Sequence, residues 1–98
     1  MRRVIVRYRV RPERVDENES LVRAVYAELA ESQPPGLRYA TFKLADGVSF
    51  VHIALLEDPT DNPLQRVAAF RTFSEDVGGR CDEPPVVVEM DEVGSYRF

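Results

Sequence analysis

Residues 48–56 read VSFVHIALL, a nearly unbroken apolar run that contains His52, the only histidine of the chain. A short apolar run bounded by turn residues is typical of a buried strand. The preceding pair, Asp46-Gly47, tolerates the positive φ angles of a type I′ turn. The sequence therefore predicts a hairpin in which residues 37–45 return antiparallel to this strand, with one imidazole in an apolar wall.

The register of this hairpin follows if Asp46-Gly47 is a two-residue loop. Thr41 then lies opposite His52, Tyr39 opposite Ala54 and Lys43 opposite Phe50, all on one face of the sheet. The other face is apolar throughout; it carries Ala40, Phe42, Val51, Ile53 and Leu55. Both faces of the hairpin are therefore predicted to be buried.

Two further strands flank the hairpin. Residues 3–11 alternate between apolar and basic side chains, which is the period-2 pattern of a strand with one face on the core. Residues 86–91, VVVEMD, form the last predicted strand after Pro84-Pro85. We expect Arg7 and Arg9 of the first strand to face Glu89 and Asp91 of the last one.

Two helices are predicted between the strands. The first begins either at Pro12 or at a capping box formed by Asp16 and Glu19, and it ends before Gln33-Pro34-Pro35-Gly36. Its acidic residues, Glu28 among them, are expected to face water. The second helix begins at Asn62-Pro63, an N-cap followed by proline, and ends at Gly78-Gly79.

The order of strand, helix, strand, strand, helix and strand predicts an α+β fold of the ferredoxin-like βαββαβ type for a single domain, residues 1–98. The four-stranded antiparallel sheet has the order 4-1-3-2, with both helices on one face. Phe42, Val51, Ile53 and Leu55 then form an apolar patch on the helix-free face, which a monomer would expose to water. We therefore expect a homodimer formed through this face.

Composition argues against several classes of function. The net charge of −4 opposes binding to nucleic acid, and residues 47–53 mimic an RNA-recognition signature with Phe50 as the only aromatic residue, Val48 and Ile53 taking the other aromatic positions. No segment is apolar enough to span a membrane or to act as a signal peptide, so the cytoplasm is the expected location. One histidine and one cysteine, Cys81, provide no metal-ligand cluster and no internal disulfide. Neither a metal nor a cofactor is predicted.

The candidate site is the space between the sheet and the helices. His52 is the candidate catalytic residue, because a neutral imidazole accepts a proton near neutral pH. The residues expected to line this space and bind a substrate are Tyr8, Asn18, Tyr26, Tyr39, Thr41, Phe50, Phe70 and Phe73. An alternative is that His52 forms a hydrogen bond with Thr41 and only fills the core.

Nearly the whole chain resembles a known superfamily. VIVRYRVRPE, PPGLRYATFKLADGVSFVHIALLEDP and the helix led by Asn-Pro are similar to the dimeric α/β-barrel proteins, particularly the branch related to antibiotic-biosynthesis monooxygenases. The resemblance implies a dimer with one cavity per subunit. His52, in Phe-Val-His-Ile, matches a cavity histidine of the plant polyketide cyclases in that superfamily. Their second histidine corresponds to Val4 here, and the tryptophan and helix histidine of the haem-degrading members are absent.

On this basis the sequence predicts a protein that binds a small aromatic or polyketide-type metabolite. The leading hypothesis is a cofactor-independent monooxygenase in which His52 orients or deprotonates the substrate. Two alternatives stay open: a non-catalytic ligand-binding or dimerising accessory protein, and a polyketide cyclase or isomerase that uses the same cavity.

Overall fold

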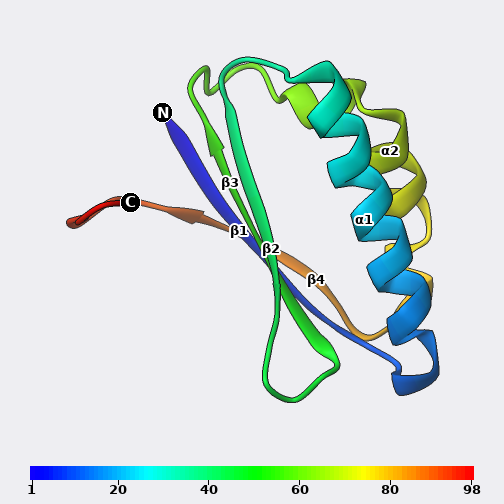
Figure 1. The fold of residues 1–98 in the computed structure, drawn as a ribbon. Coiled ribbons are helices and arrows are strands. Elements are labelled where there is room, and N and C mark those ends of the chain that lie inside the picture. Colours follow the sequence, from blue (N-terminus) through cyan, green and yellow to red (C-terminus); the bar gives the residue numbers. More distant parts are fainter.

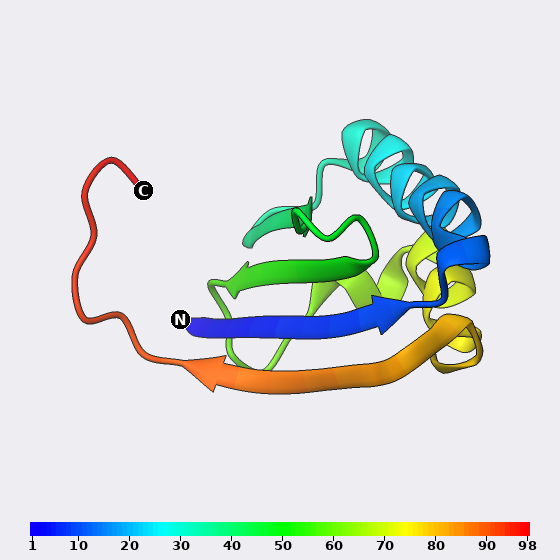
Figure 2. The same cartoon turned by 90° about the horizontal axis from the view of Figure 1, so that it is seen from below.

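The computed structural model describes residues 1–98 and contains one antiparallel sheet of four strands. The strands lie in the order β2-β3-β1-β4, which is the predicted order read from the other edge. Their bounds are β1 Arg2–Val10, β2 Leu37–Lys43, β3 Ser49–Leu56 and β4 Cys81–Met90. The ferredoxin-like α+β prediction is confirmed, and β3 with His52 occupies a central position between β1 and β2 (Figure 2).

The hairpin has the register that the sequence predicts. Thr41 lies opposite His52 and Tyr39 opposite Ala54. The type I′ turn, however, is wrong, because Gly47 has a φ of 78° while Asp46 does not adopt a positive φ. The Asp46 carboxylate instead accepts hydrogen bonds from the backbone N–H groups of Val48 and Ser49, which closes the turn without a second left-handed residue.

The first helical segment lies entirely on one side of the sheet (Figure 1). A 3-10 turn, η1 (Pro12–Arg14), precedes α1 (Val15–Ser32), so the chain turns at Pro12 and no capping box forms at Asp16. The helix ends where Gln33 takes a left-handed conformation, with a φ of 44°.

The second helix is interrupted, unlike the continuous helix that the sequence predicts. It consists of η2 (Pro63–Arg66), α2 (Ala68–Glu75) and α3 (Val77–Arg80), all on the same side of the sheet as α1 (Figure 1). Asn62 caps η2 as predicted, by accepting a hydrogen bond from the Leu64 N–H group. Gly78 and Gly79 lie within α3 and do not end the helix.

The Glu28 side chain caps the N-terminus of α2, which begins in the middle of the second helical segment. Val67 has an extended backbone and no capping side chain, and the first two N–H groups of α2 would otherwise lack partners. The Glu28 carboxylate of α1 accepts both, from Ala68 and from Ala69, at 3.0 Å each. Glu28 therefore holds two helices together, and the expectation that it faces only water is wrong.

The core between sheet and helices is built around aromatic and branched side chains. Tyr8 and Phe50 stack with ring centroids 5.6 Å apart, and Phe73 from α2 packs against Tyr8. Val25 of α1 is buried in the same cluster. These contacts fix the position of β1 and β3 beneath the helices.

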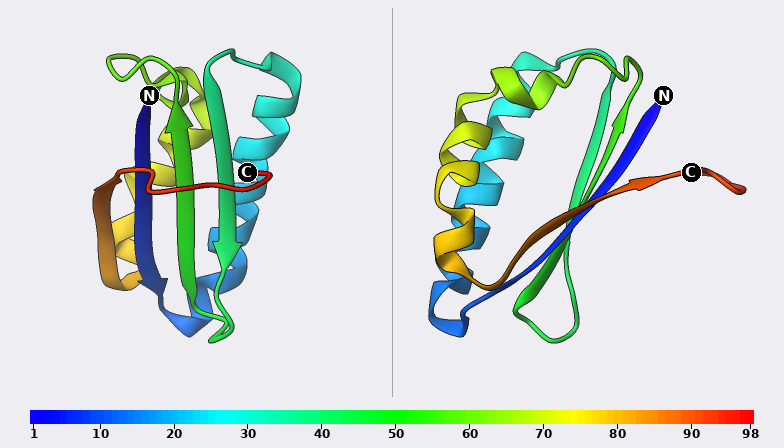
Figure 3. Two further views of the ribbon diagram at one scale, coloured as in Figure 1. Left: turned by 90° about the vertical axis from the view of Figure 1, so that its left-hand side faces the viewer. Right: turned by 180° about the vertical axis from the view of Figure 1, so that it is seen from behind.

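The opposite face of the sheet has no helix over it (Figure 3). The register aligns Ala40, Ile53, Ile5 and Val88 in one apolar row across all four strands. After β4 the chain runs out beyond this face, and Phe98 borders a shallow depression there.

The last strand differs from expectation in its charged residues. Glu89 lies opposite Val4 and pairs with Arg2 at 2.8 Å, whereas Arg9 lies near Asp82 and Glu83. The predicted contacts of Arg7 and Arg9 with Glu89 and Asp91 are therefore wrong. The structure also has no helix that could cross a membrane and no cluster of side chains suited to a metal ion.

Candidate functional site

A cavity of about 340 Å³ opens between the sheet and the segment from η2 to α3. Most of its wall is apolar, and polar side chains are concentrated at a few points. This combination of volume and lining is typical of small-molecule sites. The lining residues are Arg2, Val4, Val6, Tyr8, Tyr39, His52, Ala54, Leu56, Asn62, Leu64, Gln65, Phe70, Phe73, Ser74, Val77, Pro85 and Val87.

His52 lies in the sheet wall of this cavity and is hydrogen-bonded at both ring nitrogens. The Tyr8 hydroxyl is 2.7 Å from Nε2. The Tyr39 hydroxyl is 2.6 Å and the Thr41 hydroxyl 3.0 Å from Nδ1. A compact polar centre therefore forms from three strands, with one hydroxyl from β1, two from β2 and the imidazole from β3, because β1 and β2 flank β3.

The polar centre continues in two directions behind the cavity wall. On one side, the Tyr8 hydroxyl accepts a hydrogen bond of 3.0 Å from the Asn18 amide, and Asn18 accepts one of 3.1 Å from Arg80. On the other side, Thr41 is 2.7 Å from the hydroxyl of Tyr26, a half-buried residue of α1. Every buried polar side-chain atom in the structure has a partner.

Burial controls the protonation of these groups. It lowers the pKa of His52 to about 4, so the imidazole is neutral at neutral pH. It raises the pKa of Tyr8 and of Tyr39 well above the ordinary value of a phenol. For Tyr8 the hydrogen bond from Asn18 and the charge of Arg80 act in the opposite direction. The resting site therefore contains neutral phenols around a neutral imidazole.

The structure brings some of the predicted site residues to the cavity and leaves others behind its wall. His52, Tyr8, Tyr39, Phe70 and Phe73 line it. The four other predicted residues do not: Asn18, Tyr26, Thr41 and Phe50. Asn18 contacts Tyr8, Phe50 stacks on Tyr8, and Tyr26 stacks on Tyr39 at 5.5 Å, so each supports a lining residue.

Sequence reasoning missed two groups of residues at this site. Arg80 follows two glycines and reads as a loop residue, and its partner Asn18 is distant in the sequence. The sequence contains one indication of this contact: Asn18 is a polar residue on the apolar face of the first predicted helix. The lining residues Arg2, Asn62, Gln65 and Ser74 were also missed, because they come from separate parts of the chain, β1 and the segment from Asn62 to α2.

No protein-family model and no curated protein matches this sequence. Solved structures do match. One is an antibiotic biosynthesis monooxygenase, 24% identical with a TM-score of 0.75, which covers 96% of this chain and 100% of its own. The chain has the fold of that monooxygenase. A Nitrosomonas europaea protein described provisionally under the same name is 20% identical, with a TM-score of 0.77 and the same coverage.

A third structure is SnoaB from Streptomyces nogalater, a cofactor-independent oxygenase. It is 18% identical with a TM-score of 0.70, and the alignment covers 99% of this chain and 97% of SnoaB. The structural matches extend over nearly the full length of each chain, and their TM-scores establish a shared fold. Activity is a separate question, because one fold supports many reactions.

Proposed function

We propose that this protein binds a hydroxylated aromatic or polyketide-type ligand in the cavity beneath α2 and oxygenates it with molecular oxygen. The observation that supports the proposal most is the cavity of about 340 Å³ whose apolar wall contains His52, Tyr8 and Tyr39. An engineered cavity of about 150 Å³ binds benzene, so roughly two or three fused rings suit this volume.

The chemistry of the wall fits a ligand with an acidic C–H or phenolic O–H group. Phe70 and Phe73 offer aromatic surfaces, and Tyr8 and Tyr39 offer hydroxyls that orient a carbonyl or phenol oxygen. Exclusion of water strengthens these hydrogen bonds. A neutral His52 can accept the ligand's proton, and the anion formed beside it stabilises the resulting imidazolium.

The proposed reaction needs no co-reactant other than O₂. Loss of a C–H proton gives a carbanion that reduces O₂ and forms a C–O bond. The peroxide anion takes the proton back from His52, and the hydroperoxide that results loses water, so a CH₂ group becomes a carbonyl and one O₂ yields one water. The name of SnoaB, a cofactor-independent oxygenase with this fold, supports the same class of reaction here.

A non-catalytic binding protein is the second candidate. Both ring nitrogens of His52 already have partners within the chain, at 2.7 Å for Nε2 and 2.6 Å for Nδ1. A histidine satisfied in this way can be purely structural. In that case the cavity would bind the same class of ligand and leave it unchanged.

We also propose that two copies of the chain associate through the helix-free faces of their sheets. The row of Ala40, Ile53, Ile5 and Val88 supports this proposal, because side chains of this kind are seldom left exposed over a whole sheet face.

Oxygen consumption with anthrone as the probe tests the proposed reaction. Anthrone has an acidic CH₂ group and gives anthraquinone and water with O₂. We expect the protein to accelerate oxygen uptake and His52→Ala to reduce the acceleration at least about tenfold, since general-base groups contribute about 10² or more. Ligand binding in both proteins without any acceleration would refute the oxygenase proposal and favour the binding protein.

A further inference from the structure

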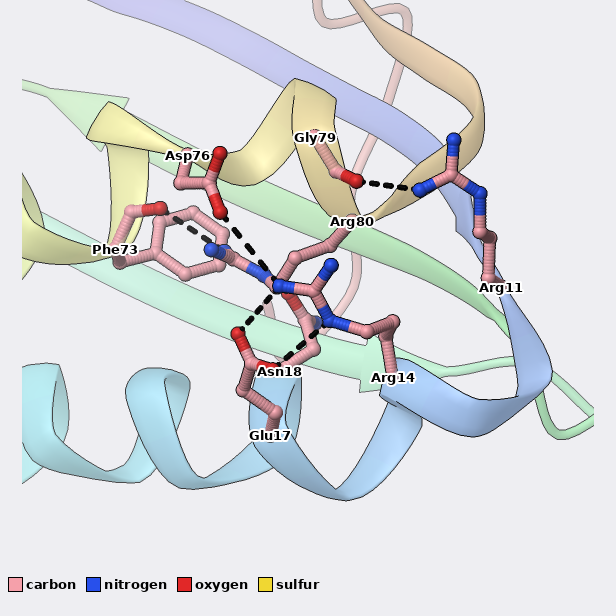
Figure 4. A network of polar contacts seen from close by, with 8 residues as sticks. All are labelled: Arg11, Arg14, Glu17, Asn18, Phe73, Asp76, Gly79 and Arg80. Atoms are coloured by element: carbon pink, nitrogen blue, oxygen red, sulfur yellow. Dashed lines mark hydrogen bonds and ion pairs between the residues drawn. The ribbon is translucent and has the colours of Figure 1, made fainter.

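Arg80 is a buried cation behind the cavity. Its side chain is 1% exposed and forms no ion pair within the chain. The guanidinium donates from Nε to Asn18 Oδ1 at 3.1 Å and from a terminal nitrogen to the Phe73 carbonyl at 2.9 Å. It also lies over the Phe73 ring (Figure 4). A buried charge without a carboxylate partner costs stability, so its retention calls for a role.

The charged neighbours of Arg80 lie toward the surface. Arg14 pairs with Glu17 at 2.8 Å and lies 3.6 Å from Asp76, and the group surrounds the outer side of Arg80 (Figure 4). The side-chain hydrogen bonds of Arg80 itself go to Asn18 and to the Phe73 carbonyl. The contacts of Arg80 therefore connect it to the polar centre of the cavity through a single side chain.

A guanidinium can only donate hydrogen bonds, and this fixes the orientation of Asn18. The amide oxygen of Asn18 must face Arg80, so its NH₂ group faces Tyr8, with Nδ2 3.0 Å from the hydroxyl. Asn18 is fully buried and has no freedom to exchange these two ends without losing both contacts.

The orientation of Asn18 in turn fixes the direction of the Tyr8 hydroxyl. The hydroxyl oxygen accepts from Asn18, and its single proton needs an acceptor. Within the chain the only remaining partner is Nε2 of His52, at 2.7 Å. If Nε2 carried a proton instead, the Tyr8 hydroxyl would have two donors and no acceptor in the protein.

We propose that Arg80 and Asn18 are positioning residues that set the direction of the hydrogen bonds through Tyr8, so that His52 carries its proton on Nδ1 and keeps Nε2 as an acceptor. The Nδ1 proton then points to the Tyr39 and Thr41 hydroxyls, both of which can accept it. Neither Arg80 nor Asn18 lines the cavity, so both act through Tyr8.

This arrangement gives the cavity a route by which a proton can reach His52. Tyr8 lines the cavity, and its oxygen can accept a proton from a ligand while its own proton moves to Nε2. One proton is gained and one is passed on, so Tyr8 returns to its starting form. The use of this route rests on the proposed function, whereas the tautomer of His52 is a property of the protein without ligand.

Nitrogen NMR of the imidazole tests the proposal directly. Because His52 is the only histidine, ¹⁵N-histidine labelling yields one ring and no assignment problem. In the ligand-free protein at neutral pH we expect a protonated Nδ1 and an unprotonated Nε2, whose signals are well separated. A protonated Nε2, or a mixture of both tautomers, would overturn the proposal.

Asn18→Asp reverses the expected result while keeping the side-chain shape. Both oxygens of an aspartate accept, so Tyr8 would donate to residue 18 and Nε2 would have to donate to Tyr8. Arg80 would gain a carboxylate partner, which favours folding of the variant. We expect the proton to move from Nδ1 to Nε2, and an unchanged tautomer would contradict the proposal.

Two further variants complete the test. Arg80→Met frees the Asn18 amide to rotate, so the second tautomer should appear beside the first; a single Nδ1 tautomer would show that Arg80 does not set the direction. Asn62→Asp makes the same chemical change at the cavity rim, where Asn62 caps η2 and has no contact with Tyr8. It should leave the tautomer unchanged, and a shift there would mean that any added carboxylate moves the proton.

The tautomer and the oxygenase proposal fail separately. A protonated Nδ1 that responds to Asn18→Asp, in a protein that does not accelerate anthrone oxidation, would retain the positioning role and remove the reaction. Acceleration of oxidation together with a protonated Nε2 would retain the reaction and remove the positioning role.

Discussion

His52 is the residue on which the proposed chemistry depends. Its side chain is only 4% exposed, yet it lines the cavity and has hydroxyl partners at both nitrogens. Burial strengthens these hydrogen bonds and at the same time disfavours the charged imidazolium. A ligand that becomes negatively charged in the cavity would remove that penalty. The imidazole is therefore neutral in the ligand-free protein, and in the proposed function it gains a proton only beside such a ligand.

The low pKa of His52 predicts a loss of stability in mild acid. Its pKa is about 4 in the folded protein and ~6.5 in an unfolded chain, so unfolding takes up a proton between these values. The contribution of His52 to stability is complete above about pH 6.5 and declines as the pH falls toward 4. Between about pH 7.5 and pH 5, the free energy of unfolding should drop by roughly 2 kcal/mol, measured by urea unfolding.

His52→Gln is the control for this effect. The amide side chain does not titrate, so the decline between about pH 7.5 and pH 5 should be largely absent from the variant. Glu17 and Glu19, whose pKa values are lowered by hydrogen bonds from Arg14 and Lys43, contribute mainly at lower pH. Equal declines in both proteins would show that His52 is not responsible.

At the scale of elements, the join between α1 and α2 depends on Glu28. Glu28→Ala removes the acceptor of two backbone N–H groups at the start of α2. We expect a loss of about 1–2 kcal/mol in the free energy of unfolding, as for other caps with a favourable charge at a helix N-terminus. Urea unfolding of the variant measures this loss.

Glu31→Ala is the matched control, because Glu31 lies on the same helix, is exposed and has no hydrogen-bond partner within the chain. Its effect should stay within about 0.5 kcal/mol. Similar losses in the two variants would mean that helix propensity or overall charge, and not the cap, determines the stability of this join.

The hairpin and the second helix show what local sequence could predict. Alternating side chains and Asp46-Gly47 determine the register of β2 and β3, because both signals act within a few residues. The start of α2 after Val67 is capped by Glu28, which lies in another helix, so no local pattern predicts this cap. The role of Arg80 is also absent from the local sequence, because it depends on a hydrogen bond to Asn18, which is 62 positions earlier in the chain.

For the whole molecule, the sheet has one covered and one uncovered face. Val87 and Val88 are neighbours on β4 with exposed fractions of 60% and 49%, but they point to opposite faces. If two chains associate through the helix-free face, Val88→Asp should shift the molar mass in light scattering toward the monomer. Val87→Asp should leave the molar mass unchanged, because Val87 lies on the cavity side.

Equal behaviour of the two valine variants would contradict the proposed interface. A monomeric wild-type protein at micromolar concentration would remove it altogether. Either result would leave the cavity in place, because its lining comes from a single chain. The fold, the cavity and the association of two copies can therefore be tested separately.

In the proposed function, the cavity beneath α2 holds an aromatic ligand against His52. Nuclear Overhauser effects between unlabelled anthraquinone and the isotopically labelled protein test it most directly. We predict contacts from the ligand's ring protons to the His52, Tyr8 and Phe73 rings, which all line the cavity. Contacts confined to Phe42, Ile53 or Leu55, on the opposite face of the sheet, would contradict ligand binding in the cavity.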